Sequence, residues 1–175
     1  MTPRLRPLLL TLLALAACGA SPDQKPDFDV RGAAVYVNSD APFTQRADFR
    51  DRLESTLEAA LTYWGGSWSD LAGRSISLEG STFVACHGVA SATGCFDGNI
   101  RISTSDLGRT FSCVEETELV HEVGHAVLGD AAHQDPRWMD FVSVAQALSG
   151  RAGYSGAGET GCPIIENVWQ HPPDL

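Results

Sequence analysis

The sequence predicts an α+β protein, in which a small twisted mixed sheet packs with two long helices and a loop-rich C-terminal part follows. Three observations support this fold class. Apolar residues recur at steps of three and four over 49–64, alternate with polar residues over 74–105, and return to helical spacing over 113–128. With 175 residues, 43% of them hydrophobic and 19% charged, the chain is long enough for one domain with a real core.

The N-terminus carries signals of export. Residues 1–17 combine two arginines with an apolar run over Leu8–Ala17, which is too short to span a membrane and is typical of a secretory signal peptide. The end of this run and the next residue, Leu-Ala-Ala-Cys, resemble a bacterial lipoprotein signal, in which the cysteine (Cys18) is acylated and becomes the first residue. A plain secretory signal, cut after an Ala-x-Ala-like site, is the alternative. Gly19 after the cysteine resembles the Gram-negative signals that direct lipoproteins to the outer membrane.

The rest of the chain is predicted to be a tethered domain. Residues 18–29 are polar with two prolines, which predicts a lipidated tether before a single domain over 30–175. The net charge of -10 argues against a nucleic-acid partner, because phosphate binding needs a basic surface. From the signal and the tether we expect an exported protein that is held at a membrane through its lipid anchor.

The other four cysteines form an even set, which in an exported chain predicts two disulfide bonds with three possible pairings. We favour Cys86 with Cys95, which closes a short loop, and Cys113 with Cys162, which closes a long one. Zinc binding by these cysteines is the alternative, but no CxxC pair is present and an oxidising compartment disfavours it. His87 is expected to be a loop residue, because no ligand stands at a matching spacing.

The first predicted elements of the domain follow one another along the chain. A strand within 31–39 is rich in β-branched and aromatic residues, and the helix over 49–64 ends at the pair Gly65–Gly66. Segments of period two come next, and they predict strands within 74–80, 81–86 and 99–104. The tight-turn signal Phe-Asp-Gly-Asn leads into the last of these strands.

The second long helix carries its own boundary signals. Ser112 with Glu115 three residues on forms a capping box, so the helix is predicted to begin near Cys113. Gly129 is a natural stop, and a turn is predicted at Asp135–Pro136.

The motif HEVGH lies inside this helix. His121 and His125 stand four residues apart, so both imidazoles project from one face about one turn apart and can reach a single zinc ion. Glu122 lies beside the first ligand, where it can take a proton from water that the metal activates. Because two histidines leave coordination positions free for another residue and for water, the motif is typical of a catalytic zinc rather than a structural one.

The chain from the first helix and the sheet to this motif resembles the metzincin clan of zinc endopeptidases, and matrixin-like catalytic domains in particular. After the motif come a glycine, a further histidine and then a methionine, as in that clan. The resemblance covers roughly 30–139 and is specific only over 121–139. It implies a zinc ion held by three histidines and Glu122 as general base. It also implies a methionine turn beneath the metal at Met139, and an edge strand near Gly98–Thr104 that pairs with an extended peptide.

The sequence departs from the clan's long pattern, HExxHxxGxxH. Gly129 comes one residue late, His133 comes two residues late, and the position of the third ligand holds Ala131. We favour His133 as the third ligand, with Asp130 as second choice, since carboxylate oxygen also binds zinc. A later glutamate, as in gluzincins, remains open: Glu159 or Glu166. We expect His133→Ala to cut zinc content sharply and Asp130→Ala to leave most of it.

The resulting prediction is a small endopeptidase with Zn²⁺ as its cofactor and a protein or peptide as its substrate. In this prediction Glu122 deprotonates the attacking water and then passes the proton to the leaving amine. The displaced third ligand keeps a second possibility open, a non-catalytic metal-binding lipoprotein that serves as a scaffold or binding module. Zinc-dependent hydrolysis of a cell-wall peptide fits the same residues.

Overall fold

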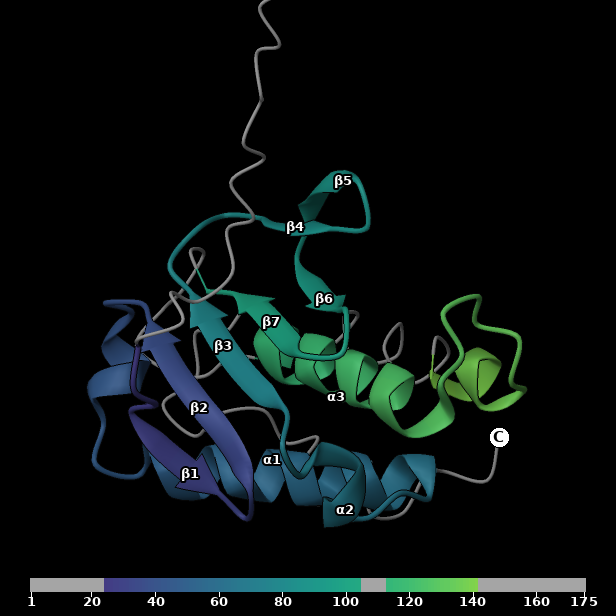
Figure 1. Ribbon diagram of the computed structural model, residues 1–175, viewed down its shortest axis with the longest axis horizontal. Helices are drawn as coiled ribbons and strands as arrows, with labels where there is room; N and C mark the ends of the chain where they lie inside the picture. Colours follow the sequence, from purple (N-terminus) through teal and green to yellow (C-terminus); the bar gives the residue numbers. More distant parts are fainter. Residues whose placement is uncertain (1–23, 105–112, 142–175) are drawn as a thin grey trace, which may run out of the picture.

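The computed structural model describes residues 24–104 and 113–141 (Figure 1). The helices are α1 (Phe49–Trp64), α2 (Trp68–Leu71) and α3 (Cys113–Leu128), with a 3-10 turn at Pro42–Gln45. The strands are β1 (Phe28–Val30), β2 (Ala33–Asn38), β3 (Ser75–Glu79), β4 (Val84–Cys86), β5 (Val89–Ala92), β6 (Gly94–Phe96) and β7 (Ile100–Ser103). The predicted α+β class is confirmed, since a mixed sheet packs with two long helices.

The main sheet has five strands in the order β1-β2-β3-β7-β6. The three central strands run parallel, and both edge strands pair antiparallel with their neighbours. Ile76 and Leu78 of β3 lie opposite Ile100 and Ile102 of β7, and all four side chains are fully buried. The alternation in the sequence thus predicted these two strands correctly, because every second residue points into the core.

The prediction of an edge strand near Gly98–Thr104 is wrong. The strand in this stretch, β7, lies between β3 and β6. The turn signal before it does make a tight turn, at Asp97–Asn99, where Gly98 has φ 100°. That turn brings the preceding segment, β6, alongside β7 and makes β6 the outermost strand.

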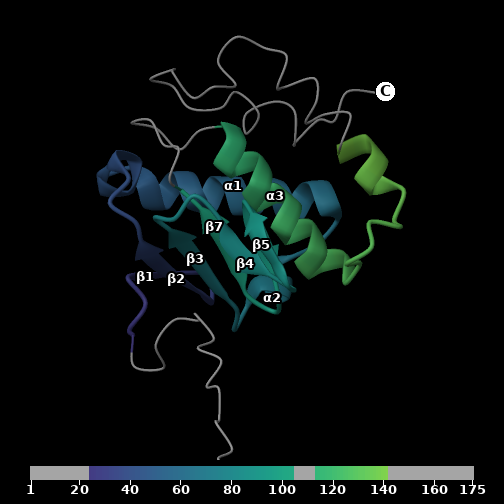
Figure 2. The same ribbon diagram turned by 90° about the horizontal axis from the view of Figure 1, so that it is seen from above.

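Helices α1 and α3 lie on the same side of the sheet (Figure 2). The apolar positions of α1, among them Leu53, Leu57 and Trp64, are buried in the core. As predicted, α1 ends at Gly65, whose φ of 72° is the left-handed conformation that glycine adopts without strain. Between the helices, the guanidinium of Arg52 lies 2.8 Å from the fully buried carboxylate of Glu116.

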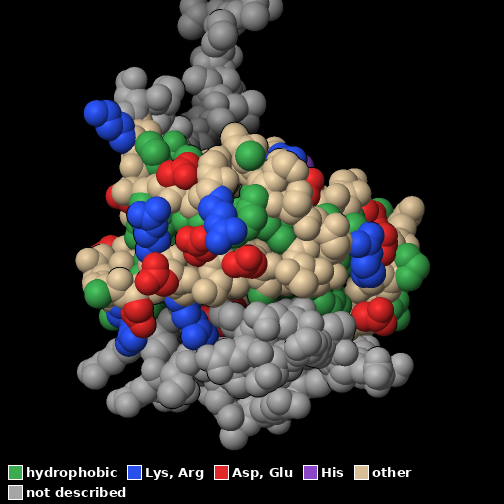
Figure 3. Space-filling view, turned by 90° about the horizontal axis from the view of Figure 1, so that it is seen from below, with side chains coloured by type: hydrophobic (Ala, Val, Ile, Leu, Met, Phe, Trp, Pro, Cys, Tyr) green, Lys and Arg blue, Asp and Glu red, His purple; other side chains and the backbone are tan. Residues whose placement is uncertain are grey.

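The surface mixes charges of both signs. On the face shown in Figure 3, basic and acidic side chains lie interspersed rather than in separate patches. Some of them form ion pairs, as Arg31 and Glu54 do at 2.7 Å. Among the described residues, no helix is both long enough and apolar enough to cross a lipid bilayer.

Several predictions involve residues outside the described ranges. They are the signal peptide over 1–17, the acylated Cys18, the capping box at Ser112 and Glu115, the Cys113–Cys162 disulfide, and the alternative ligands Glu159 and Glu166. The division into signal, tether and domain remains a prediction.

Candidate metal centre

Three imidazoles converge at one point beside α3. His121 and His125 project from the helix, and His133 comes from the loop that follows it. The Nε2 atom of His121 lies 3.1 Å from Nε2 of His125 and 3.2 Å from Nε2 of His133. Their possible ligand atoms all lie within 4.8 Å of one another, so this group could hold a metal ion. The prediction that these three residues meet is therefore confirmed.

The tautomer of His125 is fixed by its neighbour. Its Nδ1 lies 2.9 Å from the backbone oxygen of Asp130. Because a carbonyl oxygen only accepts hydrogen bonds, Nδ1 carries the proton and Nε2 carries the lone pair. The lone pair of His125 is thus directed at the point where the three rings meet, as a metal ligand requires.

Burial keeps the imidazoles of α3 neutral. Burial, together with the smaller effects of the charges of His125 and His133, lowers the pKa of His121 to about 3. Burial also lowers the pKa of His125, whereas its hydrogen bond to Asp130 raises this pKa by a smaller amount. At neutral pH both rings therefore present nitrogen lone pairs rather than N–H⁺ groups.

Asp130 organises the loop and is not a ligand of this group. Its carboxylate accepts backbone hydrogen bonds from Ala132 at 3.0 Å, from Gln134 and from Asp135 at 2.7 Å. These bonds, that of Asp135 foremost, lower the pKa of Asp130 and keep it ionised. Since the loop carries His133, the expectation that Asp130→Ala leaves most of the metal bound no longer follows.

His133 adopts an unusual backbone conformation. Its φ is 54°, in the left-handed region that non-glycine residues enter at a cost of about 1 kcal/mol. The preceding residues Ala131 and Ala132 form a turn. This turn accommodates the two extra residues between His125 and His133, so the imidazole of His133 still lies next to that of His121.

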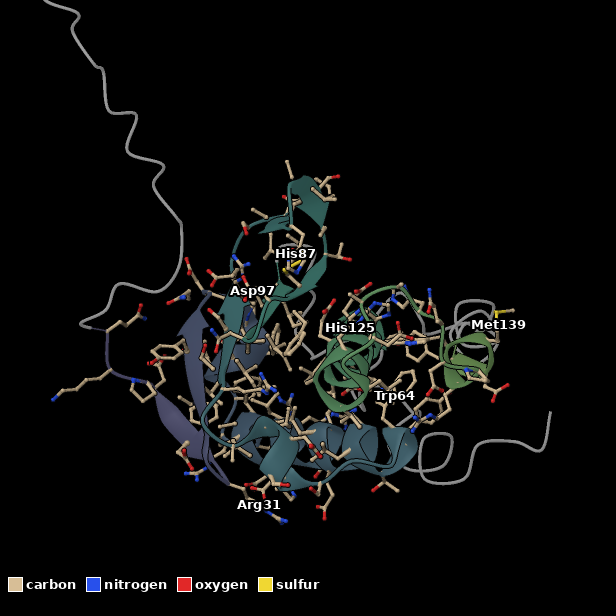
Figure 4. The ribbon with its side chains drawn as sticks, turned by 45° about the vertical axis from the view of Figure 1, so that its right-hand side comes forward. Arg31, Trp64, His87, Asp97, His125 and Met139 are labelled. Carbon is tan, nitrogen blue, oxygen red and sulfur yellow. A yellow bond between two sulfur atoms is a disulfide. The ribbon has the colours of Figure 1, made fainter. Side chains whose placement is uncertain are left out.

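Trp138, not Met139, packs against the imidazoles. Its ring centroid lies 5.0, 4.8 and 4.4 Å from those of His121, His125 and His133. Trp138 is 3% exposed, whereas Met139 is 72% exposed and points away from His125 (Figure 4). The prediction of Met139 beneath the metal is thus corrected. Residues 137–141 form a helical turn, and one step along it rotates the side chain by about 100°, from the inner to the outer face.

Gly124, inside the HEVGH motif, lets two tryptophans approach the helix. A Cβ atom at this position would lie 2.6 Å from Cε2 of Trp64 and 2.7 Å from Cη2 of Trp138. Trp64 also donates its indole N–H to the backbone oxygen of Val120 at 2.7 Å. The two indoles thus support the helix face that carries the histidines.

Glu122 is buried against the edge strand. It is 4% exposed, and a Cβ atom on Gly94 of β6 would lie only 2.5 Å from its Oε1. Burial, together with the smaller effect of the charge of Glu118, raises the pKa of Glu122 to about 8. A cation held by the nearby imidazoles would oppose this shift and favour the carboxylate.

A cavity of about 360 Å³ lies between α3, β6 and the β4–β5 hairpin. Its walls include His87, Gly94, Phe96, His121, Glu122 and His133. The predicted Cys86–Cys95 disulfide is confirmed and ties the hairpin to β6. Cys86, His87 and Cys95 also lie close together, but the disulfide occupies both sulfur atoms.

Sequence reasoning did not place His87 or Gly94 at this cavity. His87 was expected in a loop, and the structure places it in the turn between β4 and β5, on the cavity wall. Neither residue has a spacing signal, because both reach the site through strand pairing rather than through their distance along the chain from His121.

No protein-family model, curated protein sequence or solved structure matches this chain. The fold and the site define a class: an α+β protein with a three-histidine group that could hold a metal ion, beside a buried glutamate. What this site does is inferred from its side chains.

Proposed function

We propose that this protein is a metal-dependent hydrolase, and specifically a zinc endopeptidase of metzincin-like architecture. The observation that carries the proposal is the convergence of three imidazole nitrogens beside the buried carboxylate of Glu122, all on the wall of one cavity.

The donor set fits zinc. Two Zn–N bonds of 2.0–2.1 Å at a tetrahedral angle place their nitrogens about 3.3–3.4 Å apart. The distances of 3.1 and 3.2 Å from His121 Nε2 to its two neighbours are close to this value. Neutral imidazoles are ligands that zinc prefers, and three of them leave a position for water or substrate. When bound, the ion would lower the pKa of water and polarise the carbonyl oxygen of the substrate.

Glu122 is the proton carrier of the proposed reaction. Its carboxylate accepts a proton from the attacking water and passes it to the leaving amine. The buried position holds the group in place, because α3 fixes it on one side and Gly94 closes on it from the other.

The edge strand β6 provides a place for an extended peptide. The backbone N–H of Ser103 donates to the oxygen of Thr93 at 2.8 Å, so the polar groups of Gly94, the next residue, face away from β7. A peptide strand that pairs with Gly94 would lie beside the carboxylate of Glu122. We therefore assign to β6 the pairing with an extended peptide that the sequence predicted for 98–104.

The proposal is tested with the purified, zinc-loaded chain on casein and on a quenched fluorescent peptide. Cleavage should stop with a zinc chelator and return with zinc. Glu122→Gln should keep the zinc but lower kcat by about 10²–10⁴-fold, the usual contribution of a general base. Glu58→Gln, on the exposed surface of α1, is the matched control and should retain full activity. Cleavage that survives the chelator or Glu122→Gln would refute this mechanism.

Two other outcomes separate the alternatives. A non-catalytic metal-binding scaffold would bind zinc and cleave no peptide, and Glu122→Gln would leave its behaviour unchanged. A hydrolase of cell-wall peptides would act on those substrates and not on casein.

We also propose that the protein is exported and anchored by acylated Cys18. Detergent-phase partitioning of the wild-type chain, lost in Cys18→Ser, tests this placement.

A further inference from the structure

The edge strand offers its polar groups at two residues only. Because Ser103 and Thr93 form a hydrogen-bonded pair, the pairing alternates along β6, and both Gly94 and Phe96 direct their N–H and C=O groups away from β7. A peptide added to this edge would therefore bond first at Gly94 and then at Phe96.

His87 occupies the second of these positions. Its Nε2 lies 3.0 Å from the backbone oxygen of Phe96, and since the carbonyl accepts, Nε2 is the donor. The imidazole thus takes the place that the N–H of an incoming strand would fill. Figure 4 shows His87 below the β4–β5 hairpin, next to the disulfide.

His87 is held in this position by its backbone and by a covalent bond. It forms with Gly88 the two-residue turn between β4 and β5, with φ values of 44° and 87°. Turns of this kind favour Asn, Asp or Gly, so a histidine here is strained. The Cys86–Cys95 disulfide joins the residue before His87 to the residue before Phe96.

Two of the residues with a strained backbone conformation lie at the cavity. Among the described residues, positive φ values of non-glycine residues occur at Arg31, His87 and His133. The last two line the same cavity as Glu122. A strained residue that is fixed in place at a candidate site is a reason to ask what its side chain does there.

We propose that His87 is a specificity-determining residue that closes the peptide-binding edge at Phe96. Strand pairing is then limited to Gly94. The site therefore binds peptides whose chain ends or bends next to the peptide residue that pairs with Gly94. The inference rests on the proposed function, because it concerns how the same cavity holds a peptide.

The test measures peptide binding without turnover. The zinc-loaded Glu122→Gln protein is titrated with fluorescent capped peptides of increasing length, about two to eight residues, and fluorescence anisotropy gives each Kd. The same series is run with His87→Gly added. Glycine relieves the positive φ, so this variant keeps the turn. Ser91→Gly, at an exposed position of β5, is the matched control for loosening of the hairpin.

With His87 present, affinity should stop rising once the peptide has passed Gly94. With His87→Gly, it should continue to rise, to about tenfold tighter binding of the longest peptides, the effect of one or two added hydrogen bonds. Ser91→Gly should behave as the parent protein. Equal length dependence with and without His87 would overturn this inference alone. Absence of peptide binding in both proteins would overturn the proposed function, and this inference with it.

Discussion

Replacement of Gly94 by alanine should disable Glu122 without disturbing the metal ligands. A Cβ atom at position 94 would lie 2.5 Å from Oε1, 3.0 Å from Cγ and 3.1 Å from Cδ of Glu122. Non-bonded carbon and oxygen atoms need about 3.0 Å or more, so the carboxylate must retreat by roughly 0.5–1 Å. A glutamate side chain can rotate at small cost, and the fold should survive.

The displacement has a large effect because proton transfer depends on position. A shift of about 1 Å in a catalytic group costs on the order of 10²-fold in rate. We therefore expect Gly94→Ala to lower kcat about 100-fold for peptide cleavage while zinc affinity stays unchanged. Steady-state kinetics on the quenched peptide and a competition assay with a chromophoric zinc chelator measure the two quantities separately.

Two controls make this prediction refutable. Thr93→Ala changes the residue directly before β6 and should leave kcat near the parent value. Gly94→Ala in the Glu122→Gln background should have little further effect, because both changes act on the same carboxylate. Gly94→Ala activity within threefold of the parent, or full additivity of the two changes, would show that Glu122 is not positioned by β6.

Three further predictions concern the loop, the helix and the pH dependence. Asp130→Ala should weaken zinc binding about 10–100-fold in the chelator assay, because it frees the loop that carries His133; unchanged affinity would contradict the role given to the carboxylate. Gly124→Ala should destabilise the protein by about 1–3 kcal/mol in denaturant unfolding, since crowding against two indoles outweighs the gain of about 1 kcal/mol that alanine brings to a helix; a stabilised variant would refute it. Because burial raises the pKa of Glu122 to about 8, this carboxyl holds a proton at neutral pH until a cation displaces it, so zinc affinity should rise as pH rises towards 8. Calorimetry in buffers of different ionisation enthalpy should then detect a release of protons when zinc binds at neutral pH, and Glu122→Gln should make this release smaller.

Local patterns in the sequence predicted the elements that local forces determine. The apolar stripe of α1 and its end at Gly65 follow from helical periodicity and from the left-handed cap. The Cys86–Cys95 bond follows from a short separation in an even set of cysteines. His121 and His125 share a helix face wherever that helix packs, so their convergence needed no knowledge of the fold.

The order of the strands and the second wall of the cavity are non-local, and the sequence did not predict them. Alternation identified β7 as a strand but carried no information on whether another strand lies outside it. Gly94 and His87 reach the site only because β6 folds back on β7 and the hairpin folds back on β6. The exchange of Met139 for Trp138 has a related cause, because a shift of one residue in a helical turn reverses which side chain faces inward.

The late position of His133 shows that a motif fixes separations along the chain, whereas a ligand set requires distances in space. Deletion of Ala131 and Ala132 would restore the spacing of the metzincin pattern between the histidines. It would also remove the turn that Asp130 closes, and with it the path by which the imidazole returns to 3.2 Å from His121. We therefore expect the deletion to weaken zinc binding at least as much as Asp130→Ala does, by about 10–100-fold. If the shortened chain bound zinc as tightly as the parent, the ligand geometry would be set by sequence spacing after all, and the loop would have no organising role.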